Sequence, residues 1–284
     1  MAVPAKKPSR RGKQKMITAA SVDGTDVRAF DDGSGPAILV VHPGLDDGRS
    51  WAKVSSRLSR SFRVIRIVRR HYRLDLPAAA YSITAEVQDV LALADAIGPP
   101  MVIAGHSSGA VVALEAMATA PAAFAGAVLF EPPVSTAPPK PSETAAIARA
   151  NAAVADGKPG KAGQIFVRDI VGMPATSAAL LRVILTVIPQ LRALVPRQIT
   201  DLDGVGVRLD AYEKIDTPTV LLSAERSPTH LARSVNALAA VMPNAEKIVL
   251  ARRDHMAHHK APGEVAEVVQ ALACRVFPAT SQSS

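Results

Sequence analysis

The sequence has little cysteine and few aromatic residues, and each shortage excludes a class of protein. A single cysteine, Cys274, excludes an internal disulfide and a zinc site built from cysteines. This pattern is typical of a reducing compartment, so we expect a cytoplasmic location. Aromatic residues make up only 4% of the chain, which argues against the stacking surfaces that bind nucleic acid bases.

Long apolar runs are also missing. The most apolar stretch, residues 180–195, is interrupted by Arg182, Pro189, Gln190 and Arg192. A membrane span needs about 18 or more apolar residues without charge, and proline inside a helix removes a hydrogen bond. The stretch therefore predicts an amphipathic helix with a kink or a break, and we expect no membrane partner.

Positive charge is concentrated at the N-terminus. The formal net charge is +8, and residues 1–15 supply six of these charges with no acidic residue among them, which leaves +2 for the rest of the chain. Such basic runs are typically disordered and solvated. We predict a basic disordered tail at residues 1–15, a nearly neutral folded body and no nucleic-acid partner.

The rest of the chain alternates short β-rich runs with helical runs. A hydrophobic fraction of 48% is enough for a large core. The predicted strands are residues 17–20, 27–30, 37–41, 62–68, 101–104, 125–130, 219–222 and 247–250; the predicted helices between and after them are 50–58, 84–97, 110–119, 230–241 and 262–277. This rhythm predicts an α/β fold with a mostly parallel, doubly wound sheet.

The rhythm stops between residues 134 and 206, where no convincing strand occurs. Residues 142–154, 162–171 and 175–194 have helical patterns, so we predict a helical cap at 134–206, inserted late in a sheet domain made of 16–133 and 207–278. Residues 279–284 are predicted to be a polar C-terminal tail. The third cap helix has an apolar stripe, which is either a packing surface or a pocket wall: Val183, Ile184, Val187, Ile188 and Leu191.

The strongest local motif is Gly105-His106-Ser107-Ser108-Gly109, between a predicted strand and a predicted helix. A G-x-S-x-G sequence in this setting is typical of a nucleophile elbow, a tight turn that exposes the serine hydroxyl. The glycines leave room for the strand and the helix to approach closely. We predict that Ser107 is a nucleophile, which requires a nearby base.

Among seven histidines, His255 is the best candidate for that base, because it follows a strand and precedes the last helix. His258 and His259 are predicted to be a solvated helix start; no set of carboxylates or cysteines completes a metal site with them, so we expect no metal. His106, inside the elbow, is predicted to be structural.

These features resemble the α/β-hydrolase superfamily, specifically its cofactor-free, cap-bearing, esterase-like members. The resemblance covers residues 17–277 and rests on the His42-Pro43-Gly44 loop, the elbow, the place of the cap and the Asp254-His255-Met256-Ala257 segment. It implies that Ser107 is the nucleophile, that His255 is the general base and that no cofactor is needed.

The resemblance also implies an oxyanion hole of two backbone N–H groups. One comes from Ser108, directly after the nucleophile. Pro43 occupies the position where the family has a glycine and lacks an N–H, so Gly44 is the expected second donor, with Leu45 as the alternative. His42 is predicted to brace this loop with side-chain hydrogen bonds.

The acid that orients His255 is not at its usual place. Many family members carry an aspartate where this chain has Ser227. Two substitutes exist: Glu131, at the end of the strand 125–130, and Glu225, two residues before Ser227. Glu131 is favoured, because a carboxylate directly after an apolar strand is costly to bury unless it is paired.

The sequence thus predicts a serine hydrolase that cleaves a carboxylic ester, a lactone or a similar small, moderately hydrophobic acyl substrate through an acyl-enzyme. Two alternatives remain open. One is a cofactor-free lyase or perhydrolase on the same fold, since a fold does not determine a reaction. The other is a hydrolase-shaped protein that binds a ligand without catalysis. The oligomeric state is not predicted.

Overall fold

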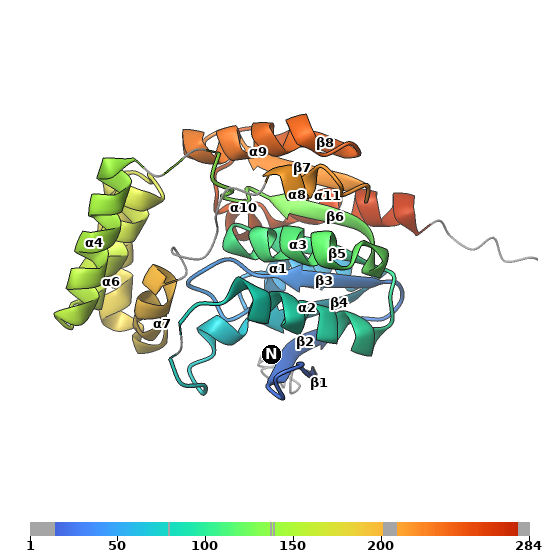
Figure 1. Ribbon diagram of the computed structural model, residues 1–284, viewed down its shortest axis with the longest axis horizontal. Helices are drawn as coiled ribbons and strands as arrows, with labels where there is room; N and C mark the ends of the chain where they lie inside the picture. The colour runs from blue at the N-terminus through green and yellow to red at the C-terminus, as the bar shows by residue number, and fades with distance from the viewer. Residues whose placement is uncertain (1–14, 79, 137, 139, 201–208, 278–284) are drawn as a thin grey trace, which may run out of the picture.

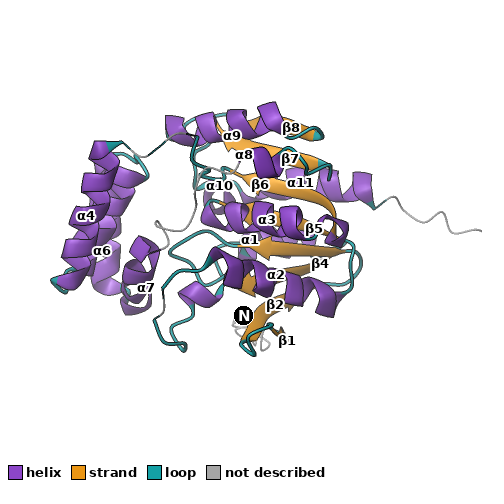
Figure 2. Ribbon diagram, in the orientation of Figure 1, coloured by secondary structure: helices purple, strands orange, loops and turns teal. Residues whose placement is uncertain are grey.

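The computed structural model describes residues 15–78, 80–136, 138, 140–200 and 209–277. Within these residues, eight strands form one sheet in the order β1-β2-β4-β3-β5-β6-β7-β8. β2 pairs antiparallel with β1 and β4, and every other pair is parallel, which confirms the predicted fold class (Figure 2). The strands are β1 (Met16–Ala20), β2 (Asp26–Asp32), β3 (Ala37–Val41), β4 (Arg63–Val68), β5 (Met101–His106), β6 (Phe124–Phe130), β7 (Thr219–Ala224) and β8 (Ala245–Leu250).

Helices cover both faces of this sheet (Figure 1). The helices on one face are α2 (Ile83–Ile97), α3 (Ser108–Thr119), α8 (Leu209–Tyr212) and α9 (Thr229–Val241); those on the other are α1 (Ala52–Leu58), α10 (Ala257–Lys260) and α11 (Pro262–Val276). Alternate residues of a central strand point to opposite faces, so Leu39 joins one apolar cluster and Val40 the other. Burial on both sides explains why the strand at residues 37–41 is apolar throughout.

In the described part of the stretch between β6 and β7, four further helices lie beside the sheet in Figure 1. They are α4 (Pro141–Ala155), α5 (Pro159–Ile165), α6 (Ala175–Val187) and α7 (Pro189–Thr200), with one turn of π-helix, η3 (Phe166–Ile170), after α5. These helices share a small apolar cluster of their own, to which each contributes. The predicted break in residues 180–195 occurs at Ile188, because Pro189 has no N–H to continue α6.

The apolar stripe of the third predicted cap helix is largely exposed. Val183, Val187 and Ile188 are 60%, 69% and 43% exposed. The packing-surface alternative is therefore wrong for Val187 and Ile188, and the pocket-wall alternative stays a prediction. The opposite side of α6 is the packed one, where Ala178 and Leu185 are fully buried. The apolar face of this helix extends around most of its circumference, and sequence periodicity did not indicate which side is covered.

Both predicted tails fall almost entirely outside the described residues. Lys15 is described: its ammonium lies 2.5 Å from the Asp31 carboxylate, and its carbonyl oxygen accepts a hydrogen bond from the Asp31 N–H. Residue 15 therefore extends the first strand pair rather than the predicted tail. Within the described part of the chain, no helix is both long enough and apolar enough to cross a bilayer.

Candidate active site

Ser107 occupies a strained turn between β5 and α3. Its φ and ψ are 54° and −128°, a backbone conformation that a residue with a side chain rarely adopts. The flanking glycines make this turn possible: a Cβ at Gly105 would lie 2.5 Å from the Cα of Ala110, and one at Gly109 only 2.3 Å from the carbonyl oxygen of His42. The motif therefore has the geometry of a nucleophile elbow.

Glu131 and His255 are in direct contact. Glu131 is completely buried at the end of β6, with a positive φ of 47°, and its Oε2 lies 2.6 Å from Nδ1 of His255. His255 follows β8 and is also buried. The carboxylate thus binds one nitrogen of the imidazole, which fixes the orientation of the ring.

Two groups at the end of β7 hold the same carboxylate. The N–H of Ala224 donates to Oε1 of Glu131 at 2.8 Å, and the hydroxyl of Ser227 donates to Oε2 at 2.9 Å. β6 and β7 are neighbours in parallel register, so their carboxyl ends meet. Ser227, which stands where an aspartate was expected, therefore hydrogen-bonds the carboxylate that comes from the adjacent strand. This contact joins residues 96 apart in the sequence, and no local pattern indicates it.

Glu225, the alternative acid, has a different environment. Its side chain is exposed, and its Oε2 accepts the backbone N–H of Arg252 at 2.5 Å. The Glu225 carboxylate therefore stabilises the turn that follows β8. Of the two candidate carboxylates, the structure places Glu131 against His255.

Several rings pack around His255. The ring of His106 stacks on Phe130 with 4.6 Å between centroids, and lies 4.7 Å from His255 and 4.4 Å from His258. Because His106 directly precedes Ser107, these contacts bring the elbow and the loop of His255 together. Burial lowers the pKa of His106 well below its ordinary value, so this ring is neutral at pH 7.

The prediction that His258 is solvated is wrong. We expected residues 258 and 259 to form a solvated helix start, but His258 is 1% exposed and stacks on Trp51, with 6.1 Å between centroids. Only His259 is exposed. Burial lowers the pKa of His258 to about 3, so it adds no charge beside His255 near neutral pH. Its partners are Trp51, just before α1, and His106, at the end of β5; both are distant in sequence, and no local pattern indicated these contacts.

The loop after β3 is held by His42, as predicted. Nε2 of His42 accepts the backbone N–H of Arg69 at 3.1 Å, so its proton is on Nδ1, which donates to the carbonyl of Pro43 at 2.7 Å. Burial lowers the pKa of His42 and keeps it in this neutral form. The alternative donor Leu45 has a positive φ of 53° and packs against the inserted helices.

Gly44 lies directly beneath a side chain of the inserted helices. A Cβ on Gly44 would lie 1.7 Å from Oε1 of Gln198, a buried residue of α7, and 2.9 Å from the hydroxyl of Tyr72. The Tyr72 hydroxyl donates to the same Oε1 at 3.0 Å. Neither residue was predicted at the site, because their contact joins segments 126 residues apart and no local pattern records it.

Candidate metal ligands do not assemble in the described part of the chain: it contains no group of three or more histidine, cysteine, aspartate or glutamate side chains suited to hold an ion. The arrangement instead combines a half-buried serine turn, an imidazole bound to a buried carboxylate, and two backbone segments. One is Ser108, next to the serine in sequence, and the other is the loop of residues 42–44, whose His42 carbonyl packs against Gly109.

Comparisons with known proteins concern the fold as a whole. A model of the alpha/beta hydrolase family matches residues 38–268. An alpha/beta hydrolase from Sphaerobacter thermophilus is 27% identical, with a TM-score of 0.76, over 90% of this chain and 99% of that chain. A thermophilic esterase from Thermogutta terrifontis, 18% identical with a TM-score of 0.72 over 92% of this chain and 99% of that one, shares the fold.

A match among curated proteins is shorter. An uncharacterised protein of Mycobacterium tuberculosis is 37% identical over 87 residues, which are 29% of this chain and 25% of that protein. The chain therefore aligns with about a quarter of this relative's length.

Proposed function

The chain belongs to the alpha/beta hydrolase family, and from this premise and the site geometry we propose that it is a serine hydrolase acting on a carboxylic ester, a lactone or a similar small acyl substrate. The observation that carries the proposal is the buried Glu131–His255 contact of 2.6 Å beside the strained Ser107 turn. A buried carboxylate that orients an imidazole beside a serine is the arrangement that activates a weak nucleophile.

In the proposed mechanism, Ser107 Oγ attacks the acyl carbonyl while Nε2 of His255 takes its proton. Glu131 binds Nδ1, so Nε2 is left for this proton transfer, and the carboxylate stabilises the imidazolium that forms. The backbone N–H groups of Gly44 and Ser108 hold the negative oxygen of the tetrahedral intermediate. The protonated His255 returns its proton to the leaving alcohol, and then activates water to release the acyl group from Ser107.

We assign helices α4–α7 the role of a cap that closes the site from the side of Gly44. Gln198 of α7 supports this assignment, because it lies on Gly44, the proposed oxyanion donor. The helices of this cap share an apolar cluster that includes Ala146, Ile165 and Leu185, and Leu45, next to Gly44 in the loop, packs against it. A small and moderately hydrophobic substrate suits such a site.

Active-site labelling tests the proposal. A fluorophosphonate probe should label the wild type and should fail to label Ser107→Ala. Ser56→Ala is the matched control, because Ser56 is an exposed serine whose hydroxyl donates only to the backbone of its own helix, at Lys53. Equal labelling of Ser107→Ala and the wild type would refute the role of Ser107.

A panel of p-nitrophenyl esters of increasing acyl length then tests the reaction. We expect hydrolysis of short and medium chains, which is lost in Ser107→Ala. A protein that is labelled but hydrolyses no ester or lactone would fit the lyase or perhydrolase alternative instead. One that is neither labelled nor active, while small ligands still raise its Tm, would fit a binding protein.

A further inference from the structure

We propose that Arg69 is a positioning residue that sets the separation of the two oxyanion-hole segments, by tying the loop of Gly44 to the first residue of α3. This inference rests on the proposed function, because the two segments matter as a pair only if their N–H groups bind a negative oxygen. Arg69 itself would not touch the substrate.

Arg69 makes hydrogen bonds to both segments. It lies just after β4 and is 1% exposed. Its Nη1 donates to the hydroxyl of Ser108 at 2.8 Å and to the carbonyl oxygen of His42 at 3.3 Å, and its backbone N–H donates to Nε2 of His42 at 3.1 Å. One residue therefore joins the elbow to the His42 loop, both through its side chain and through its backbone.

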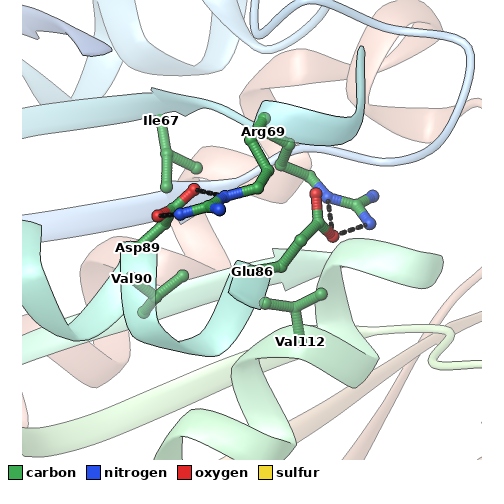
Figure 3. A pocket seen from close by; sticks show the side chains of 7 residues that line it. Ile67, Arg69, Glu86, Asp89, Val90 and Val112 are labelled. Carbon is green, nitrogen blue, oxygen red and sulfur yellow. Dashed lines mark hydrogen bonds and ion pairs between the residues drawn. The ribbon is translucent and has the colours of Figure 1, made fainter. Parts of the chain in front are cut away.

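A second contact fixes the guanidinium from its other side. Glu86 of α2, 2% exposed, accepts hydrogen bonds on Oε2 from Nε of Arg69 at 2.9 Å and from Nη2 (Figure 3). A buried charge without a partner is very unfavourable, so the pair is held together. Because the guanidinium is a rigid planar group, pairing Nε and Nη2 with Glu86 leaves Nη1 directed at the elbow.

The two segments are packed closely enough for this link to matter. The space above Gly109, one residue after Ser108, is taken by the carbonyl oxygens of Val41 and His42, which would lie 2.4 and 2.3 Å from an added Cβ. Donors of an oxyanion hole act within a narrow range of distances, about 2.7–3.1 Å from the oxygen they stabilise. Loss of the Arg69 link would let the loop and the elbow shift relative to one another.

The neighbouring ion pair is a natural control. Asp89 lies one turn after Glu86 on α2 and accepts hydrogen bonds from Nε of Arg70 at 2.6 Å and from Nη2 (Figure 3). Arg70 also binds Asp23 and Ser21 at the turn between β1 and β2. The two pairs share the same residue types and the same helix, but Arg70 contacts the turn between β1 and β2, whereas Arg69 contacts the His42 loop and the elbow.

Two variants and one control test the proposal. Ser108→Ala removes the hydroxyl that Arg69 binds, but it keeps the backbone N–H of residue 108 and leaves no buried charge unpaired. Arg69→Lys keeps the charge but cannot bridge Glu86 and Ser108 together. Arg70→Lys is the control. Each is assayed for kcat and KM on an ester substrate and for the affinity of a trifluoromethyl ketone, which forms a tetrahedral adduct with the serine.

We expect Ser108→Ala to lower kcat about tenfold with little change in KM, and to weaken the ketone by a similar factor, since one hydrogen bond to a charged group is lost. The pH profile should not move, because the Glu131–His255 contact is untouched. Arg69→Lys should have a larger effect. Arg70→Lys should lower Tm but leave kcat and ketone affinity within about twofold of the wild type.

Either of two results would overturn this inference while leaving the proposed function standing. They are unchanged kcat and ketone affinity in Ser108→Ala, or equal losses of kcat in Arg69→Lys and Arg70→Lys. Either would be seen in a wild type that is labelled by fluorophosphonate and active on esters. A wild type that is not labelled would overturn the proposed function and this inference with it. Because Ser108→Ala removes only a half-buried hydroxyl, the outcome does not depend on whether Arg69→Lys folds.

Discussion

Moving the carboxylate from residue 131, after β6, to residue 227, after β7, is the most direct test of the Glu131–His255 contact. In Glu131→Gln, the amide oxygen can still accept the N–H of Ala224, and the hydroxyl of Ser227 can turn to accept from the amide nitrogen. Nδ1 of His255, however, then faces this nitrogen and is left without an acceptor. The imidazole loses its charge partner and the hydrogen bond that selects its tautomer. We expect kcat to fall by about 10⁴, which corresponds to about 5 kcal/mol.

A second substitution should restore part of this loss. Oε2 of Glu131 lies 2.9 Å from Oγ of Ser227 and 2.6 Å from Nδ1 of His255, so Oγ of residue 227 is at most about 5.5 Å from the imidazole, and an aspartate reaches one bond further than a serine. In Glu131→Gln with Ser227→Asp, the new carboxylate can accept from Nδ1 and from the glutamine amide. We expect kcat to rise at least about tenfold above Glu131→Gln alone, since an ionic acceptor is regained.

The assay is kcat/KM on a p-nitrophenyl ester, with circular dichroism melting curves to show that each variant is folded. Glu225→Gln is the matched control: its carboxylate is exposed and binds the backbone of Arg252, so its activity should stay within about twofold of the wild type. The assignment of Glu131 is refuted if Glu131→Gln keeps more than about a tenth of the activity, or if Glu225→Gln loses as much.

Three further predictions concern burial and close packing. The pKa of His258 is about 3 in the folded protein against an ordinary 6.5, so as the pH falls the unfolded chain takes up this proton first. The contribution of neutral His258 to the free energy of unfolding should be fully present above pH 6.5 and should decrease as the pH falls towards 3. In urea unfolding, His258→Phe should lose about 2 kcal/mol less of this free energy than the wild type between pH 7 and 5. Gly109→Ala should destabilise the fold by about 3 kcal/mol or more, because backbone oxygens lie 2.3 and 2.4 Å from the new Cβ. Gly160→Ala, whose nearest contact is at 3.9 Å, is the control, and its Tm should stay near that of the wild type while the Tm of Gly109→Ala falls. Gly44→Ala should lower esterase activity by displacing Gln198, and adding Gln198→Ala should recover part of it; if the double variant is no better than the single one, the clash is not the cause.

Much of the fold and part of the site could be predicted because their signals are local. The apolar run of residues 37–41, the alternation of strands and helices, and the break at Pro189 each depend on a few neighbouring residues. The elbow is also indicated by a short motif. Gly105 is required because its neighbour in space, Ala110, lies only five residues further along the chain, and Gly109 is required because it packs against the end of the adjacent strand. The choice of Glu131 over Glu225 followed from the cost of burying an unpaired carboxylate, and the structure pairs that carboxylate with His255.

Other features were decided only by tertiary structure. The hydroxyl of Ser227 binds a carboxylate 96 residues away, the hydroxyl of Tyr72 meets Gln198 across 126 residues, and the guanidinium of Arg69 reaches Ser108 across 39. The exposed side of α6 and the burial of His258 likewise depend on which surfaces are covered by other segments. Sequence periodicity determines which side chains share a face of a helix or strand, whereas packing between distant segments determines whether that face is buried and which polar groups it meets.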